Sequence, residues 1–241
     1  LGSALVCAGS AALNHYLERD SDALMKRTRN RPLPKGVISS NSAMIFGILL
    51  VLSGVLLICL EVNLLTAFLS LLTAFLYVLV YTPMKKVNWL NTTIGAIPGA
   101  IPPMGGWSAA TGNLELGAWI LFLILFVWQH PHFYSIAWLF KEDYKRAGFK
   151  MLSLDDSTGQ RIFRHTVLYA LALIPVSVLP FLIGISGTKY LIGALALGIG
   201  LLFYSRNLQK TGSNHAAHLL LKASVLYLPA LLILIVIDRS F

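Results

Sequence analysis

Long apolar runs recur along almost the whole chain, and they constrain its fold more than any other feature. Of the 241 residues, 56% are hydrophobic and only 12% are charged, and the mean hydropathy is +0.73. In a bilayer only helices and closed barrels satisfy their backbone groups, and runs of about 20 apolar residues match a helical span. The sequence therefore predicts an all-α, polytopic transmembrane helical bundle that forms a single integral-membrane domain over residues 1–241. We expect about eight spans, at roughly 1–17, 43–60, 65–83, 90–108, 117–139, 166–185, 190–205 and 218–237.

Basic residues are distributed unevenly among the connections between these spans. The net charge is +9, yet six Lys and Arg residues lie in 18–42 and six more in 140–165. Smaller basic groups lie at 85–86 and 206–222, whereas the intervening connections carry only two basic residues. This is the positive-inside pattern, so we expect the basic loops on the cytoplasmic side. A bacterial inner membrane is the expected location. Because topology accounts for most of the charge, we expect the lipid bilayer and not nucleic acid as the surrounding partner.

A row of oxygen-bearing side chains marks the end of the first apolar run. Asn14, Glu18 and Asp22 recur every four residues, and this spacing places them on one face of a helix. Carboxylates on one stripe suit Mg²⁺, which prefers oxygen ligands and usually keeps waters and substrate phosphates in its shell. The row therefore predicts a catalytic site in which Glu18 and Asp22 bind Mg²⁺.

A dense run of bases follows the acidic row. Lys26, Arg27, Arg29 and Arg31 lie within six residues of one another. Guanidinium and ammonium groups bind phosphate oxygens well. Cations and oxygen ligands beside an apolar bundle predict a lipid diphosphate as substrate.

A second region repeats the same order of acids followed by bases. Glu142 and Asp143 precede a basic stretch that ends at Lys150. Four expected spans separate the regions 14–36 and 138–150, so both should lie on the same side of the membrane and face one cavity. We expect Glu142 and Asp143 to be further metal ligands, Asp143 to take part in catalysis, and Lys150 to bind the diphosphate.

Two histidines near the end of the fifth expected span are candidates for binding the acceptor. His132 and Asp143 are eleven residues apart, so they share a face if one helix continues through both. His130 should then point elsewhere, and Pro131 between the two histidines should kink the helix. An ionisable residue inside a span is a functional candidate, although packing within the bundle is an alternative for either histidine.

The segment 88–107 is unusually rich in Gly and Pro for a membrane span. Pro98, Pro102 and Pro103 are expected to break its helix near the outer end. Close packing of helices through Gly95 is one role for this segment, and lining the cavity is the other. Asn91 at its start is a candidate for meeting an anion or the acceptor.

Together these motifs resemble the UbiA superfamily of intramembrane prenyltransferases, along nearly the whole chain. The runs RTRNRPL (27–33) and WQHPHF (128–133) point to the haem-directed branch and away from the quinone and chlorophyll branches. The residues that carry the resemblance are Asn14-xxx-Glu18-xxx-Asp22, Met25 to Leu33, Tyr81-Thr82-Pro83, Gly95 to Trp107, and Trp128 to Phe133 followed by Asp143-Tyr144-xx-Ala147-Gly148.

The resemblance implies a bundle of nine helices, so we expect the chain to lack the first helix and the start of the second. It implies Mg²⁺ as cofactor, farnesyl diphosphate as donor and the vinyl group of haem b as acceptor, which gives haem O for terminal oxidase assembly. His132 would hold the haem iron or orient the acceptor. Haem A synthase or oxidase assembly proteins are the protein partners that this branch implies.

One departure and two alternatives remain. The superfamily's second motif usually offers two aspartates spaced for a metal, whereas this chain has Glu142, Asp143 and then Tyr144. Whether this motif binds its own Mg²⁺ is therefore open. A quinone precursor or another aromatic compound is the alternative acceptor. A membrane transporter is the alternative class, but transporter sites lie near the midplane and not among bases at helix ends.

Overall fold

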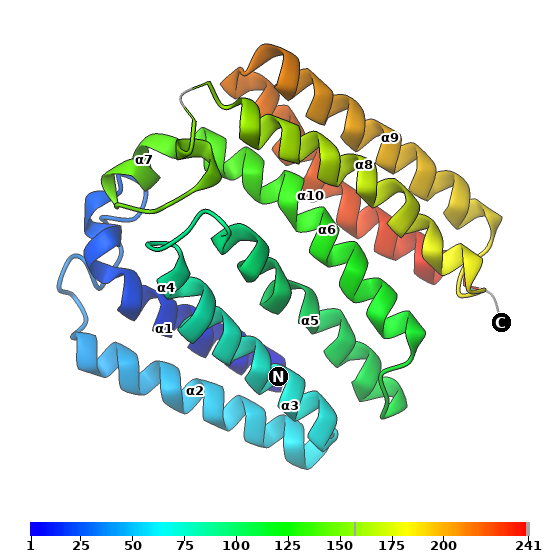
Figure 1. The fold of residues 1–241 in the computed structure, drawn as a ribbon. Coiled ribbons are helices and arrows are strands. Elements are labelled where there is room, and N and C mark those ends of the chain that lie inside the picture. Colours follow the sequence, from blue (N-terminus) through cyan, green and yellow to red (C-terminus); the bar gives the residue numbers. More distant parts are fainter. Residues whose placement is uncertain (157, 240–241) are drawn as a thin grey trace. The chain divides into compact units, whose positions relative to one another are not determined.

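The structure is a computed structural model that describes residues 1–156 and 158–239 (Figure 1). Eight long helical stretches correspond to the eight expected spans, so the predicted all-α membrane bundle is confirmed. They are α1 (Gly2–Leu24), α2 (Ser40–Glu61), α3 (Leu64–Phe75) with its continuation to Met84, α5 (Asn91–Thr111), α6 (Leu116–Leu139), α8 (Gln160–Leu182), α9 (Thr188–Thr211) and α10 (Asn214–Ile237). Two short helices, α7 (Lys141–Arg146) and the 3₁₀-helix η2 (Leu152–Leu154), join α6 to α8.

Six of the long helices are both long enough and apolar enough to cross a membrane. They are α2, the continuous stretch Leu64–Met84, α6, α8, α9 and α10. The helices α1 and α5 have similar lengths but do not belong to this group, because α1 ends in polar residues and α5 is rich in Gly and Pro. The protein is therefore an integral membrane protein, and the helix that carries the acidic row is less apolar than its six spanning helices.

The described chain groups into two compact units. The first contains residues 1–118 and 142–151, and the second contains 119–141 and the chain from Leu152 onward. All of the acidic and basic residues predicted for the site belong to the first unit, and both candidate histidines belong to the second.

Paired glycines hold α1 closely against α2 in the first unit (Figure 1). A Cβ atom on Gly9 would lie 2.6 Å from the Gly47 carbonyl oxygen, and one on Gly54 would lie 2.7 Å from the Gly2 carbonyl oxygen. Only glycine permits this approach of two backbones. The N-terminal half of the helix that carries the acidic row is thus held closely against α2.

The stretch after α3 widens into a π-helix, η1 (Leu76–Tyr81), before the short helix α4 (Thr82–Met84). The N–H of Thr82 bonds the Tyr77 carbonyl, five residues back. Pro83 follows at once, and because proline has no N–H the preceding turn is free to widen. Both η1 and α4 contact α1, so the π-turn determines which side chains meet the acidic row.

The expected break in α5 is wrong, because the helix continues from Asn91 to Thr111 through Pro98, Pro102 and Pro103. Neighbouring helices allow proline inside membrane helices by supplying other partners to polar groups. Near the C-terminal end of α5, away from the carbonyls that the prolines leave without donors, the Asn63 side chain donates to the Ser108 carbonyl (2.8 Å). The helix ends at Thr111 and is capped by Gly112, whose φ of 76° is the left-handed conformation that glycine adopts easily.

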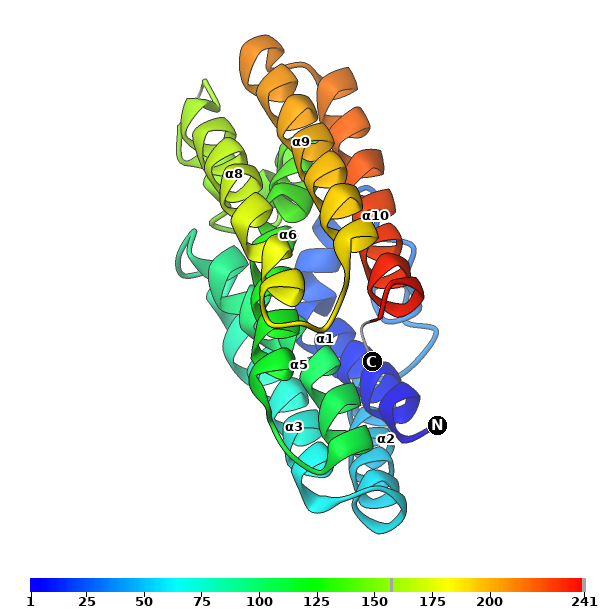
Figure 2. The ribbon, with the colours of Figure 1, turned by 90° about the vertical axis from the view of Figure 1, so that its right-hand side faces the viewer.

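In the second unit, α9 packs against both α8 and α10 (Figure 2). Buried hydroxyls join these helices: Tyr227 bonds the Ser177 hydroxyl (2.7 Å), and Tyr190 donates to the Ser177 carbonyl (2.7 Å). Helix α6 is tied to α10 by Trp128, whose indole N–H donates to the Ser224 carbonyl (2.9 Å). This unit therefore holds the segment around His132 through directional bonds as well as apolar packing.

Candidate active site

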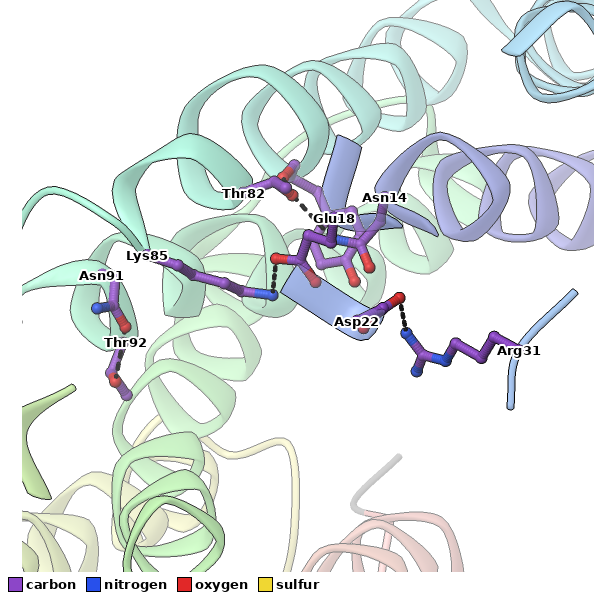
Figure 3. Close-up of polar contacts among 9 residues, drawn as sticks. Asn14, Glu18, Asp22, Arg31, Thr82, Lys85, Asn91 and Thr92 are labelled. Atoms are coloured by element: carbon purple, nitrogen blue, oxygen red, sulfur yellow. Dashed lines mark hydrogen bonds and ion pairs between the residues drawn. The ribbon is translucent and has the colours of Figure 1, made fainter. Parts of the chain in front are cut away.

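The acidic row on α1 faces inward, as the four-residue spacing predicted. Asn14 and Glu18 are each 6% exposed, and Asp22 is fully buried. Figure 3 shows the three side chains in sequence along one side of the helix, with Lys85 reaching Glu18 and Arg31 reaching Asp22. A buried row of this kind holds its charges only because each carboxylate has a basic partner.

Lys85 neutralises Glu18, and the sequence reasoning did not single out this lysine. Its Nζ lies 2.7 Å from Glu18 Oε1 and 4.6 Å from the centre of the Tyr81 ring. Burial lowers the pKa of Lys85, but Tyr81 and Glu18 outweigh it and hold the pKa above its ordinary value. The sequence does contain a signal for Lys85. It lies four residues after Tyr81, the first residue of the Tyr81-Thr82-Pro83 motif, so the two side chains share a helical face.

Asp22 is bound by Arg31 through one of its two oxygens. Arg31 Nη1 lies 2.7 Å from Asp22 Oδ2, whereas the buried Oδ1 of Asp22 has no hydrogen-bond partner. The hydroxyl of Thr28 donates to the Asp22 main-chain carbonyl (2.9 Å) and folds the following segment back on the helix end. An anionic oxygen that is buried without a partner is a suitable ligand for a cation.

The basic segment after α1 presents most of its side chains outward. Lys26, Arg27 and Arg29 are exposed, while Met25 is buried and anchors the turn. The Arg27 guanidinium lies over the Tyr144 ring, 4.8 Å from its centre. The exposed bases are accessible to an anion that approaches this end of the first unit.

The two motif regions do contact each other, through Asp143. Its carboxylate accepts a hydrogen bond from the Lys26 main-chain N–H (3.1 Å) and pairs with the Arg146 guanidinium. Burial raises the pKa of Asp143, but these bonds outweigh it and hold the pKa below its usual range. Asp143 therefore fixes the start of the basic segment, and Glu142 beside it is exposed.

His132 and Asp143 would share a face only if one helix continued through both, and the structure does not meet this condition. Helix α6 ends at Leu139, and α7 begins separately at Lys141. The acids of α7 lie in its first turn and its bases in its last turn, which suits the dipole of an independent helix. The eleven-residue spacing therefore does not place these two residues on a common face.

Asn91 and Lys150 meet through main-chain contacts. The Asn91 amide donates to the carbonyls of Asn88 and Lys150, both at 2.7 Å, and the Lys150 N–H donates to the Lys85 carbonyl (2.6 Å). Both amide hydrogens of the buried Asn91 are thus used, which favours a positioning role over contact with an anion. The Lys150 side chain is exposed, and its main chain fixes the position of Lys85.

The four carboxylates predicted as metal ligands do not gather in one cluster. Among residues 1–156 and 158–239, no three His, Cys, Asp or Glu side chains are placed to hold a metal ion. Glu18 and Asp22 share the row on α1, whereas Asp143 is engaged by main-chain and guanidinium donors. Any cation at the row would therefore need oxygens from Asn14, water or a substrate to complete its shell.

The two candidate histidines of the second unit have different surroundings. His130 is fully buried and stacks on Tyr169, with 3.6 Å between ring centres, and its Nδ1 contacts the Phe126 carbonyl (2.8 Å). His132 is half-buried, stacks on Trp128 and contacts the Ser224 hydroxyl through Nδ1 (2.9 Å). These surroundings favour packing for His130.

The contact with Ser224 determines which nitrogen of His132 carries the proton. Ser224 has one hydroxyl hydrogen and directs it to the Leu221 carbonyl (2.7 Å), which can only accept. Both contacts of Ser224 are satisfied together when Nδ1 of His132 donates to the hydroxyl oxygen, and this tautomer leaves the lone pair on Nε2. A histidine fixed in this tautomer is prepared to accept a hydrogen bond or bind a metal through Nε2.

The chain is similar to known proteins over almost its whole length. The profile of the UbiA prenyltransferase family matches residues 1–226. The "Protoheme IX farnesyltransferase" of Solibacter usitatus (strain Ellin6076) is 46% identical over 99% of this chain and 82% of the relative. The protein of the same name from Salinibacter ruber (strain DSM 13855 / M31) is 45% identical, over 99% of this chain and 84% of the relative.

Two solved structures share the fold. One is described as "Structural and mechanistic insights into the biosynthesis of Digeranylgeranylglyceryl phosphate synthase in membranes". It has a TM-score of 0.78 and 21% identity and covers 97% of this chain and 81% of the solved chain. The other, a UbiA homolog from Aeropyrum pernix K1 in its apo form, has a TM-score of 0.69 and 16% identity and covers 95% and 85%. At these identities the similarity concerns the fold alone.

Proposed function

Because this chain belongs to the UbiA prenyltransferase family, we propose that it transfers the farnesyl group of farnesyl diphosphate to the vinyl group of haem b and so forms haem O. The bond between farnesyl C1 and the diphosphate oxygen breaks, and a carbon–carbon bond to the vinyl group forms. Water then adds to the resulting cation and loses a proton, which gives the hydroxyethylfarnesyl group. The names and identities of the relatives support this choice of donor and acceptor.

The observation that carries the proposal is the buried acidic row with its basic partners. Glu18, Asp22 and the Asn14 amide offer only oxygen as metal ligands, and the unpartnered Asp22 Oδ1 fits a cation. These residues would hold Mg²⁺, which neutralises charge on the departing diphosphate when bound. Lys85 and Arg31 place two positive charges beside the row, and these would stabilise the same developing charge.

The exposed bases of the segment after α1 would receive the diphosphate first. Lys26, Arg27 and Arg29 all face outward, and the segment is held in place by Asp143. The main-chain N–H of Lys150 donates to the Lys85 carbonyl, and from this position the Lys150 side chain would bind the diphosphate. Apolar helices around such a site exclude water from an allylic cation until the acceptor has reacted.

We assign acceptor binding to His132, with Nε2 directed to the haem iron or a haem substituent. Its tautomer, fixed by Ser224, supports the assignment, as does its half-buried position. His130 and Asn91 remain second to His132 for acceptor binding. His130 is stacked on Tyr169, and the Asn91 amide is bonded to main-chain carbonyls.

The proposal includes a setting in the cell. The distribution of Lys and Arg supports an inner membrane orientation with the basic loops in the cytoplasm. A haem O product would be passed to haem A synthase or to terminal oxidase assembly proteins, which are therefore the proposed protein partners.

Mass spectrometry of haem products tests this function. Membranes containing the protein are supplied with haem b and farnesyl diphosphate, with and without Mg²⁺, and extracted haem is examined for the hydroxyethylfarnesyl adduct. A parallel reaction replaces haem b by 4-hydroxybenzoate, an aromatic acceptor, and Asp22→Ala membranes are the inactive control. Prenylation of 4-hydroxybenzoate with no haem O would transfer the proposal to an aromatic acceptor, and no prenylated product from either would reject it.

A further inference from the structure

The structure links Thr82 to the acidic row through a chain of two hydrogen bonds. The Asn14 side-chain nitrogen Nδ2 lies 3.0 Å from the Thr82 hydroxyl oxygen, and this hydroxyl lies 2.8 Å from the Tyr77 carbonyl oxygen. Asn14 and Thr82 are both buried, and they are 68 residues apart in the sequence. Figure 3 shows Thr82 against Asn14, on the side of the row formed by α4.

The direction of these bonds follows from their chemistry. A carbonyl oxygen only accepts, so the single hydroxyl hydrogen of Thr82 is directed to Tyr77. The hydroxyl oxygen can then only accept from Asn14, and the amide must present its NH₂ group to Thr82. The amide oxygen of Asn14 is thereby directed away from Thr82. Without this constraint the two ends of an amide are nearly equivalent in shape and can exchange.

We propose that Thr82 is a positioning residue that fixes the Asn14 amide with its oxygen available to the cation on the row of Glu18 and Asp22. This inference rests on the proposed function, since it specifies how the oxygen ligands of that site are oriented. An amide that turned over would place two N–H donors where a cation needs an oxygen. The π-turn supports the arrangement, because it brings the Tyr77 carbonyl to the N–H of Thr82 and to its hydroxyl together.

Mn²⁺ alone, titrated into the purified protein in detergent and followed by the electron paramagnetic resonance of free Mn²⁺, tests the inference without turnover. Thr82→Val keeps the shape of the side chain but loses the hydroxyl, and we expect Mn²⁺ affinity to fall about 10–100-fold, as for other residues that orient metal ligands. Thr82→Ser keeps the hydroxyl and should bind Mn²⁺ almost as the unmodified protein does.

Replacing the amide by a carboxylate separates orientation from packing. In Asn14→Asp both terminal atoms of the side chain are oxygens, so turning the group over changes nothing. Thr82→Val in this background should then have little effect on Mn²⁺ affinity. Three results would each overturn the inference. Thr82→Val could leave the Mn²⁺ affinity unchanged, Thr82→Ser could lower it as much as Thr82→Val does, or Thr82→Val could lower it equally in the Asn14→Asp background. If Thr82→Val does not fold, Thr82→Cys, whose thiol is a weak donor and acceptor, replaces it.

The outcome is independent of the haem assay. A protein that forms haem O but shows no dependence of Mn²⁺ affinity on Thr82 would reject this inference and keep the proposed function. A protein whose Mn²⁺ affinity depends on Thr82 but which forms no haem O would keep this inference and reject the proposed function.

Discussion

Replacing Lys85 by methionine removes the cation that neutralises Glu18 and keeps most of the apolar length of the side chain. The two charged groups are 2.7 Å apart, and only 8% of the Glu18 side chain is exposed, so water cannot replace the lost ammonium group. Removing one partner of a buried ion pair costs about 3–5 kcal/mol. At about 2–4 °C for each kcal/mol in a chain of this size, the melting temperature should fall by roughly 6–20 °C.

Thermal unfolding in dodecyl maltoside, followed by circular dichroism without substrate, measures this change. Lys86→Met is the matched control, because it removes a neighbouring charge from an exposed side chain. The double variant Glu18→Gln/Lys85→Met should recover most of the lost melting temperature, because neither partner of the buried ion pair is then charged. A melting temperature equal to that of Lys86→Met at neutral pH would refute the reasoning.

Three further predictions follow from the first unit. Gly9→Ala should destabilise the protein by about 1–3 kcal/mol, because the added Cβ meets the α2 backbone. Gly105→Ala is the control and should not lower the melting temperature, because no neighbouring segment lies within 4 Å of its Cβ. Asp143→Asn should weaken folding by about 1–3 kcal/mol at pH 7. Because the folded pKa of Asp143 is lowered, its contribution is present above about pH 4 and is lost as the pH falls through that folded pKa, so acid titration should destabilise the unmodified protein more than Asp143→Asn. Arg29→Lys keeps the charge but loses the planar fork, and it should raise the KM for farnesyl diphosphate with little change in melting temperature; an unchanged KM would assign Arg29 to topology alone.

The fold and the acidic row could be predicted because both depend on local periodicity. Apolar runs of bilayer length determine the helices, and the spacing of four residues determines that Asn14, Glu18 and Asp22 share a buried face. Nothing beyond the nearest turns of the helix is needed for either conclusion.

The parts that sequence reasoning missed depend on distant contacts or on local competition. The pairing of Glu18 with Lys85 joins residues that are 67 positions apart, across the π-turn. The break expected at Pro98, Pro102 and Pro103 did not occur, and a helix packed in a bundle tolerates proline in a way that local sequence rules do not capture. The helix counted through Asp143 ends early, because the charges of residues 141–146 favour a separate short helix.

The ion pairs of the first unit have a consequence for how a diphosphate would enter and leave. Glu18 and Asp22 are already matched by Lys85 and Arg31, so the resting row carries no excess charge. A magnesium diphosphate therefore cannot simply add to it. If Mg²⁺ bound Glu18 and Asp22 as proposed, Lys85 and Arg31 would lose their acidic partners and could bind phosphate oxygens instead. Loading would then resemble ion exchange, in which a strong gross attraction leaves a small net free energy. The return of Lys85 to Glu18 and of Arg31 to Asp22 would help to expel the diphosphate product.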